Sequence, residues 1–172
     1  ESQCLEERLK LLSYIDKIKE TPLADMIEED RLAFAGKHTS KHDTSIYTFD
    51  VEWFAGTKGA KEFHLLLQNR PEEFDQALSH IPLTGEVTTA QYQAFVSAYL
   101  GIFSSQNLDQ KASLMPATRL LAMRRPDLFV PLTNTNADII CRGLGLAKLA
   151  KNDFDGYWYD LINSIKSFAW WH

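Results

Sequence analysis

Two histidines and a neighbouring aspartate have the spacing that first suggests metal chemistry. His38 and His42 stand four positions apart, next to Asp43, which would place both imidazoles on one face of a helix. The stretch from Gly36 to Thr44, however, is polar and rich in Lys, Ser and Thr, which favours a loop. No Glu follows the first His, as the helical zinc-protease motif requires. We therefore predict no metal site and no bound cofactor.

Asp50 and Glu52 raise the alternative of a metal-dependent nuclease. Around them aromatic and β-branched residues alternate with polar ones, which predicts a short half-buried strand near residues 46–54. A nuclease strand of this type usually carries a Lys two positions after its second acid, and Phe54 stands there instead. Two acids on the solvent face of a strand are the simpler interpretation.

Other patterns that carry catalysis are missing from the sequence. Its serines lack a G-x-S-x-G elbow, and there is no Walker-type phosphate loop. Cys141 follows two isoleucines and is expected to be buried and inert. Cys4 and Cys141 are also too few for a disulfide framework. The sequence therefore predicts no catalytic residue and favours a non-catalytic role for this chain.

The strongest functional signal is a set of cationic residues in the last third of the chain. The segment from Ile139 to Lys148 is expected to form a helix, a Gly-Leu-Gly turn and the start of a second helix. It resembles the helix-hairpin-helix modules that hold a DNA backbone, because glycines let the backbone approach a phosphate and a helix N-terminus adds partial positive charge. The residues predicted to bind nucleic acid are Arg119, Arg124, Arg125, Arg142, Gly143, Gly145, Lys148 and Lys151.

The same segment has a purely structural alternative. A glycine after a helix is an ordinary C-terminal cap, and basic residues near a helix C-terminus complement its dipole. If the basic residues do bind DNA, contacts to phosphates would give affinity without reading the base sequence.

Composition limits the classes of function. Of the 172 residues, 45% are hydrophobic and 24% are charged, which is typical of a globular protein. The net charge of −5 excludes a polycation that wraps nucleic acid, so contact with DNA would need a local basic patch. No apolar run is long enough to span a bilayer, and no signal-peptide pattern opens the sequence. We expect a cytoplasmic protein without membrane contact.

Hydrophobic periodicity predicts a mainly α, multi-helix single domain with at most a short β element near residues 46–54. The expected helices cover residues 4–20, 23–34, 61–68, a segment after Pro71, 88–104, 115–125, 134 or 136 to 141, and 153–168. Thr88 and Gln91 form a capping-box pattern at the start of one of them. Residues 1–59 are expected to form an N-terminal helical hairpin with a loop and a strand, and residues 60–172 a helical domain with the Gly-Leu-Gly hairpin.

A family resemblance adds to this interpretation. The run T-R-L-L-A-M-R-R-P-D-L-F-V-P-L, from Thr118 to Leu132, and Y-W-Y-D-L-I-N-S-I-K-S-F-A-W-W, from Tyr157 to Trp171, resemble a helical domain of prokaryotic restriction and phage-defence proteins. The resemblance covers roughly residues 60–171 and implies a role in DNA-directed defence, with no active site to transfer. Where an acidic or Ser-Lys-Asn run is expected after the Val-Pro-Leu turn, this chain has Thr133 to Asn136.

The leading hypothesis is a non-catalytic helical domain of a DNA-directed defence system that contacts the nucleic-acid backbone through its basic C-terminal face. One alternative is a protein–protein interaction module that recruits a partner protein, or further domains of the same polypeptide. Its contact surface would be the acidic N-terminal hairpin or the end at Trp170 and Trp171. The other alternative is the metal-dependent nuclease.

Overall fold

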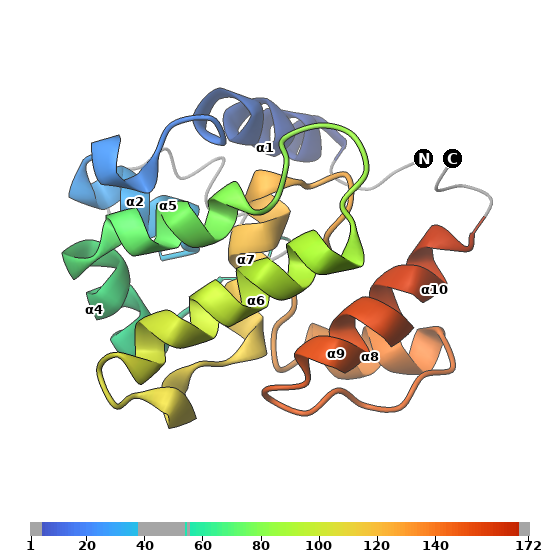
Figure 1. Ribbon diagram of the computed structural model, residues 1–172. Coiled ribbons are helices and arrows are strands. Elements are labelled where there is room, and N and C mark those ends of the chain that lie inside the picture. The colour runs from blue at the N-terminus through green and yellow to red at the C-terminus, as the bar shows by residue number, and fades with distance from the viewer. Residues whose placement is uncertain (1–4, 38–53, 55, 169–172) are drawn as a thin grey trace.

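The computed structural model describes residues 5–37, 54 and 56–168, and in these ranges the chain is mainly helical with no strand (Figure 1). The helices are α1 (Leu5–Ile18), η1 (Leu23–Asp25), α2 (Glu28–Phe34), α4 (Lys61–Asn69), α5 (Pro71–Ser79), α6 (Thr89–Ser104), η2 (Asp109–Lys111), α7 (Leu114–Arg124), α8 (Asn136–Gly143) and a terminal helix made of α9 (Phe154–Gly156), the π-helical η3 (Tyr157–Ile162) and α10 (Asn163–Lys166). The predicted mainly α fold is confirmed.

Several sequence predictions fall on residues outside these ranges. They are the strand near residues 46–54 except for Phe54, the candidate ligands His38, His42, Asp43, Asp50 and Glu52, and the terminal Trp170 and Trp171. Within the ranges that the structure describes, no helix has the length and apolar character needed to cross a membrane.

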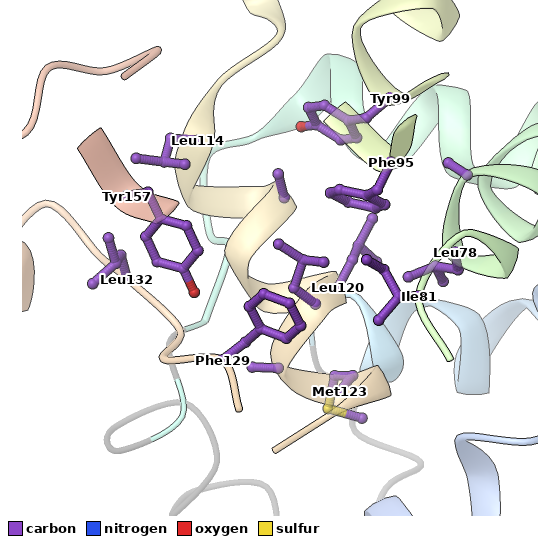
Figure 2. Close-up of a cluster of buried hydrophobic side chains, with 14 of the residues drawn as sticks. Leu78, Ile81, Phe95, Tyr99, Leu114, Leu120, Met123, Phe129, Leu132 and Tyr157 are labelled. Atoms are coloured by element: carbon purple, nitrogen blue, oxygen red, sulfur yellow. The ribbon is translucent and has the colours of Figure 1, made fainter. Parts of the chain in front are cut away.

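α7 lies in the middle of the helices and forms the centre of the hydrophobic core (Figure 1). Between Leu114 and Met123 every residue except Met115 is buried. A helix enclosed on all sides does not show one apolar stripe, which explains the weak periodicity of this segment. Figure 2 shows the side chains that surround it, among them Leu78 and Ile81, Phe95 and Tyr99 of α6, Phe129, Leu132 and Tyr157.

The terminal helix packs against α6 through aromatic side chains. The rings of Tyr92 and Trp158 stack with centroids 4.7 Å apart and an interplanar angle of 10°. The Tyr92 hydroxyl donates a hydrogen bond to the carbonyl of Phe154 (2.8 Å), and the Trp158 indole N–H donates to Thr89 Oγ1 (3.0 Å). Trp158 therefore belongs to the core.

The N-terminal helices share this core, because Leu11, Ile15, Leu23 and Phe34 belong to the same buried cluster as the residues of α7. The described core residues on both sides of the predicted division at residue 59 therefore belong to one hydrophobic cluster. Whether residues 60–172 fold without the N-terminal helices stays a prediction.

The single helix predicted from Leu23 to Phe34 is wrong, since η1 ends at Asp25 and α2 starts at Glu28. The Asp75 carboxylate accepts hydrogen bonds from the backbone N–H groups of Leu23 (2.7 Å) and Ala24 (2.9 Å). The Arg31 guanidinium donates to the carbonyls of Leu23 (2.7 Å) and Met26 (2.8 Å). These side chains provide the partners that a continuous helix would otherwise supply, so the break is stable.

Candidate functional site

Arg119 lies inside the protein, far from a phosphate-binding role. Its side chain is fully buried, and its guanidinium donates to the carbonyls of Ala33 (3.0 Å), Phe34 (3.0 Å) and Phe54 (2.9 Å). The guanidinium carbon also lies 5.2 Å from the centroid of the Phe54 ring. Burial removes this arginine from any surface that DNA could touch.

Arg125 and Arg124 also hold backbone segments together. Arg125 is 4% exposed, forms a two-bond ion pair with Asp127 (2.8 Å each) and donates to the carbonyls of Pro82 and Gly85. The half-buried Arg124 donates from Nε to the carbonyl of Ile81 (3.0 Å). Both guanidinium groups thus fix the turn between α5 and α6, and their geometry argues against a primary role in DNA contact.

The Gly-Leu-Gly segment ends α8 and does not start a second helix, so the predicted helix-hairpin-helix arrangement is wrong. Gly145 has φ +69°, the N–H of Leu146 donates to the carbonyl of Cys141 (2.8 Å), and the N–H of Gly145 donates to that of Arg142 (3.1 Å). This pair of bonds is the Schellman motif that closes many helices. Residues 146–150 after it are not helical, and the burial of Leu149 holds them against the core.

The remaining predicted contact residues are exposed. Arg142 forms an ion pair with Asp138 one helical turn earlier (3.1 Å), and Gly143, Gly145 and Lys148 lie on the surface. Lys151 is exposed as well, and it lines a cleft in the described surface.

That feature, here called the main cleft, has a volume of about 710 Å³. It lies between the loop at residues 56–60, the start of α7 and the loop at residues 132–135. The charged residues that line it are Lys58, Lys111, Lys151 and Glu62. Lys111 and Glu62 are 3.6 Å apart, a loose pair at the surface that leaves the cleft with an excess of positive charge.

A smaller side cleft of about 360 Å³ adjoins the main cleft, because Lys58 and Gly59 line both. Its other charged residues are Lys37, Lys61 and Glu28. The two clefts together are called the lysine groove. Among the described residues, its lining carries five lysines and two glutamates, a balance of +3 in a chain whose net charge is −5.

Hydrogen bonds beneath the groove hold its central loop in place. The N–H of Thr57 donates to the carbonyl of Gly36 (3.0 Å), and its hydroxyl donates to the carbonyl of Ala35. Since the single hydroxyl proton is used there, the buried His64 donates from Nε2 to Thr57 Oγ1 (2.8 Å). Burial, together with the nearby charge of Lys37, lowers the pKa of His64 to about 4, so this histidine is neutral at pH 7.

The loop on the other side of the main cleft is fixed by a reciprocal pair of hydrogen bonds. The N–H of Asn136 donates to Thr133 Oγ1 (3.0 Å), and the N–H of Thr133 donates to Asn136 Oδ1 (2.7 Å). This pair closes the turn that leads into α8, with the reciprocal pattern of a capping box. It leaves the exposed Asn134 and Thr135 at the cleft wall, in the run where the sequence departs from the family pattern.

The lysine groove was missed by sequence reasoning except for Lys151. Lys58 and Lys61 stand in or beside the Gly-Thr-Lys-Gly run at residues 56–59, whereas Lys37 follows α2 and Lys111 is in a short 3₁₀ turn about 50 positions after Lys61. The one local signal was Lys58, because a lysine in a short run that holds two glycines is typical of an exposed loop.

Among the described residues, no group of three His, Cys, Asp or Glu side chains is placed to hold a metal ion. Cys141 is buried in the core, as its position after two isoleucines suggested. The chain matches no protein-family model, and neither curated proteins nor solved structures give a match to it. The restriction and phage-defence resemblance therefore stays an expectation from the sequence alone.

Proposed function

We propose that this chain is a non-catalytic helical domain that binds the phosphate backbone of nucleic acid along the lysine groove. The observation that carries the proposal is that five lysines line two adjoining clefts in an acidic protein. Phosphate attraction acts locally and is screened within about 10 Å at 0.1 M salt, so a local patch matters more than the net charge. The resemblance to restriction and phage-defence proteins favours DNA as the polymer.

The lysine groove does not include most of the residues that the sequence predicted to bind nucleic acid. Lys151 belongs to both sets, and Arg142 and Lys148 are exposed cations on the segment that leads to it. Arg119, Arg124 and Arg125 are left out because their guanidinium groups donate to backbone carbonyls inside the fold.

The test is fluorescence anisotropy with labelled single- and double-stranded DNA at about 50 mM and about 200 mM salt. We expect binding that weakens with salt, with a slope that falls by about 0.7–0.9 for each phosphate contact removed. The variant carries Gln at the five groove lysines, which are Lys37, Lys58, Lys61, Lys111 and Lys151. Unchanged binding by this variant, with its helix content intact, would remove the proposal.

Two controls separate the groove from other positive charge. Lys10→Gln with Lys17→Gln changes lysines on α1, which does not line the groove, and is expected to leave DNA binding near the wild-type level. Arg142→Gln with Lys148→Gln tests the surface predicted from the sequence. A larger loss from this second pair than from the groove variant would return the site to the end of α8.

A protein-interaction module is the second candidate function, and one observation favours it. Leu5 and Leu9 on α1 are 51% and 56% exposed and stand four positions apart, so they lie on one face of the helix. This candidate predicts no salt-sensitive DNA binding at all. It also predicts that Leu5→Ser with Leu9→Ser releases a protein that co-purifies with the chain.

A further inference from the structure

The main cleft differs from the side cleft in volume and in the residues that line it. Its volume of about 710 Å³ lies within the range of roughly 300–1,000 Å³ that is typical of small-molecule sites. A double helix presents a convex surface, so its phosphates could meet lysines at the rim but could not enter the hollow. A single nucleotide at the end of a strand, or free in solution, could enter.

Three lysines from separate parts of the chain line this cleft. Lys58 comes from the loop before α4, Lys111 from η2 and Lys151 from the segment after α8. The backbone carbonyl of Lys151 accepts a hydrogen bond from the N–H of Leu114 (2.9 Å), which fixes this lysine beside the start of α7. With Glu62 as the one carboxylate among the described lining residues, the balance of charge is +2.

Two helices begin at the walls of the same cleft. Ala60 and Glu62 at the start of α4 line it, and so do Ser113 and Met115 at the start of α7. A helix N-terminus carries partial positive charge, so both helix dipoles add to the field of the lysines. The N–H of Glu62 already donates to its own carboxylate, which with Lys111 lowers the pKa of Glu62 although some burial opposes this.

Uncharged hydrogen-bonding groups complete the wall opposite the lysine loop. Asn134 and Thr135 are exposed at the cleft and are held there by the hydrogen bonds between Thr133 and Asn136. An amide and a hydroxyl can each donate to a phosphate oxygen or bind a sugar hydroxyl. Met115, Pro116 and Leu132 add apolar surface beside these polar groups, so the cleft offers both charged and apolar contacts to its occupant.

We propose that the main cleft binds a phosphomonoester carried by a nucleotide. A phosphomonoester has a charge of about −1.5 to −2 at pH 7, which suits a lining of +2 better than the single charge of each phosphate within a strand. Lys58, Lys111 and Lys151 contact the phosphate, and Asn134 and Thr135 contact the phosphate or the sugar. The source is either the 5′ end of a nucleic-acid strand, which rests on the proposed function, or a free mononucleotide, which does not.

The test compares two labelled single strands of one sequence, with a 5′-phosphate or a 5′-hydroxyl, in the wild-type chain. We expect the phosphorylated strand to bind about tenfold more tightly, because charge-assisted hydrogen bonds to the end group are added. Lys58→Gln with Lys111→Gln should abolish this preference. Lys37→Gln with Lys61→Gln, which removes the same charge from the side cleft, should weaken both strands equally and keep the preference.

A calorimetric titration with adenosine monophosphate separates the possible failures. Equal affinity for the two strands together with no binding of the mononucleotide overturns this inference and leaves the proposed function standing. If neither strand binds but the mononucleotide does, the proposed function fails and the cleft is a site for free nucleotides. If nothing binds, both are overturned. Asn134→Ala with Thr135→Ala, at two exposed positions, should weaken the end-phosphate preference without changing the thermal stability.

Discussion

The guanidinium of Arg119, on α7, forms hydrogen bonds with the C-terminal end of α2 in the interior of the protein. It donates to the carbonyls of Ala33 and Phe34, which belong to the last turn of α2, and to that of Phe54. Carbonyls at a helix C-terminus carry partial negative charge, so they stabilise a buried cation better than isolated carbonyls would. Arg119 therefore holds together three parts of the chain that are distant in sequence.

Replacing Arg119 with Ala should strongly destabilise the fold. Each buried carbonyl left without a donor costs about 1–3 kcal/mol, so the free energy of unfolding should fall by about 3 kcal/mol or more. The matched control is Arg142→Ala, whose exposed ion pair with Asp138 should contribute no more than about 0.5 kcal/mol. Urea unfolding followed by circular dichroism measures both. Equal midpoints for the two variants would contradict this role of Arg119.

His64 should make the fold sensitive to mild acid. Burial lowers its pKa from the ordinary 6.5 to about 4 in the folded protein, so the unfolded chain takes up a proton first as pH falls. Stability is therefore fully present above pH 6.5 and is lost between pH 6.5 and 4, by about 3 kcal/mol in total. His64→Gln keeps a donor for Thr57 but cannot titrate, so its unfolding free energy should change less over this range.

At the scale of the element, α8 shows how two neighbouring glycines can have opposite roles. Gly145 has φ +69°, a conformation that side chains with a Cβ adopt with strain, whereas Gly143 is the last residue of the helix and a Cβ there would meet no atom within 4 Å. Gly145→Ala should destabilise the protein by about 1 kcal/mol, and Gly143→Ala should stabilise it by about 0.4–1 kcal/mol. Thermal unfolding of the two variants measures the difference. The same sign for both would contradict the C-terminal cap.

Elements with local signals were the ones that the sequence could predict. α6 starts after Thr88, whose side chain and that of Gln91 form the reciprocal bonds of the predicted capping box. The break between η1 and α2 could not be predicted, because the carboxylate of Asp75 that stabilises it lies 52 residues beyond Leu23.

The candidate site was also hard to predict, because its residues are distant from one another in the sequence. Its lysines are spread from Lys37 to Lys151, and no periodic pattern relates them. The arginines chosen from the sequence had the residue type that binds phosphate. However, Arg119 and Arg125 are buried and donate to backbone carbonyls. Their burial depends on the whole fold, so it could not be predicted from the local sequence.

At the scale of the whole molecule, the N-terminal helices and the rest of the chain depend on one another. Leu11, Ile15, Leu23 and Phe34 contribute apolar surface to the cluster that surrounds α7. Polar contacts cross the same boundary, since the Asp75 carboxylate accepts from Leu23 and Arg119 donates to the end of α2. Removing the N-terminal part would expose apolar surface and leave Arg119 without these carbonyls.

We therefore expect a fragment of residues 60–172 not to fold cooperatively, although the family resemblance covers nearly the same range. Fully exposing a large buried apolar side chain costs about 1.5–3 kcal/mol, so losing the burial of several is comparable to the 5–15 kcal/mol that typically stabilises a domain. The buried Arg119 would also lose its hydrogen bonds to Ala33, Phe34 and Phe54. Urea unfolding and the dispersion of amide proton signals, compared with the full chain, measure this. A sharp transition and dispersed signals from the fragment would show instead that residues 60–172 are an independent domain. The lysine groove could then be tested in two parts, since Lys37 lies in the removed segment and Lys58 is lost with it, while Lys61, Lys111 and Lys151 remain.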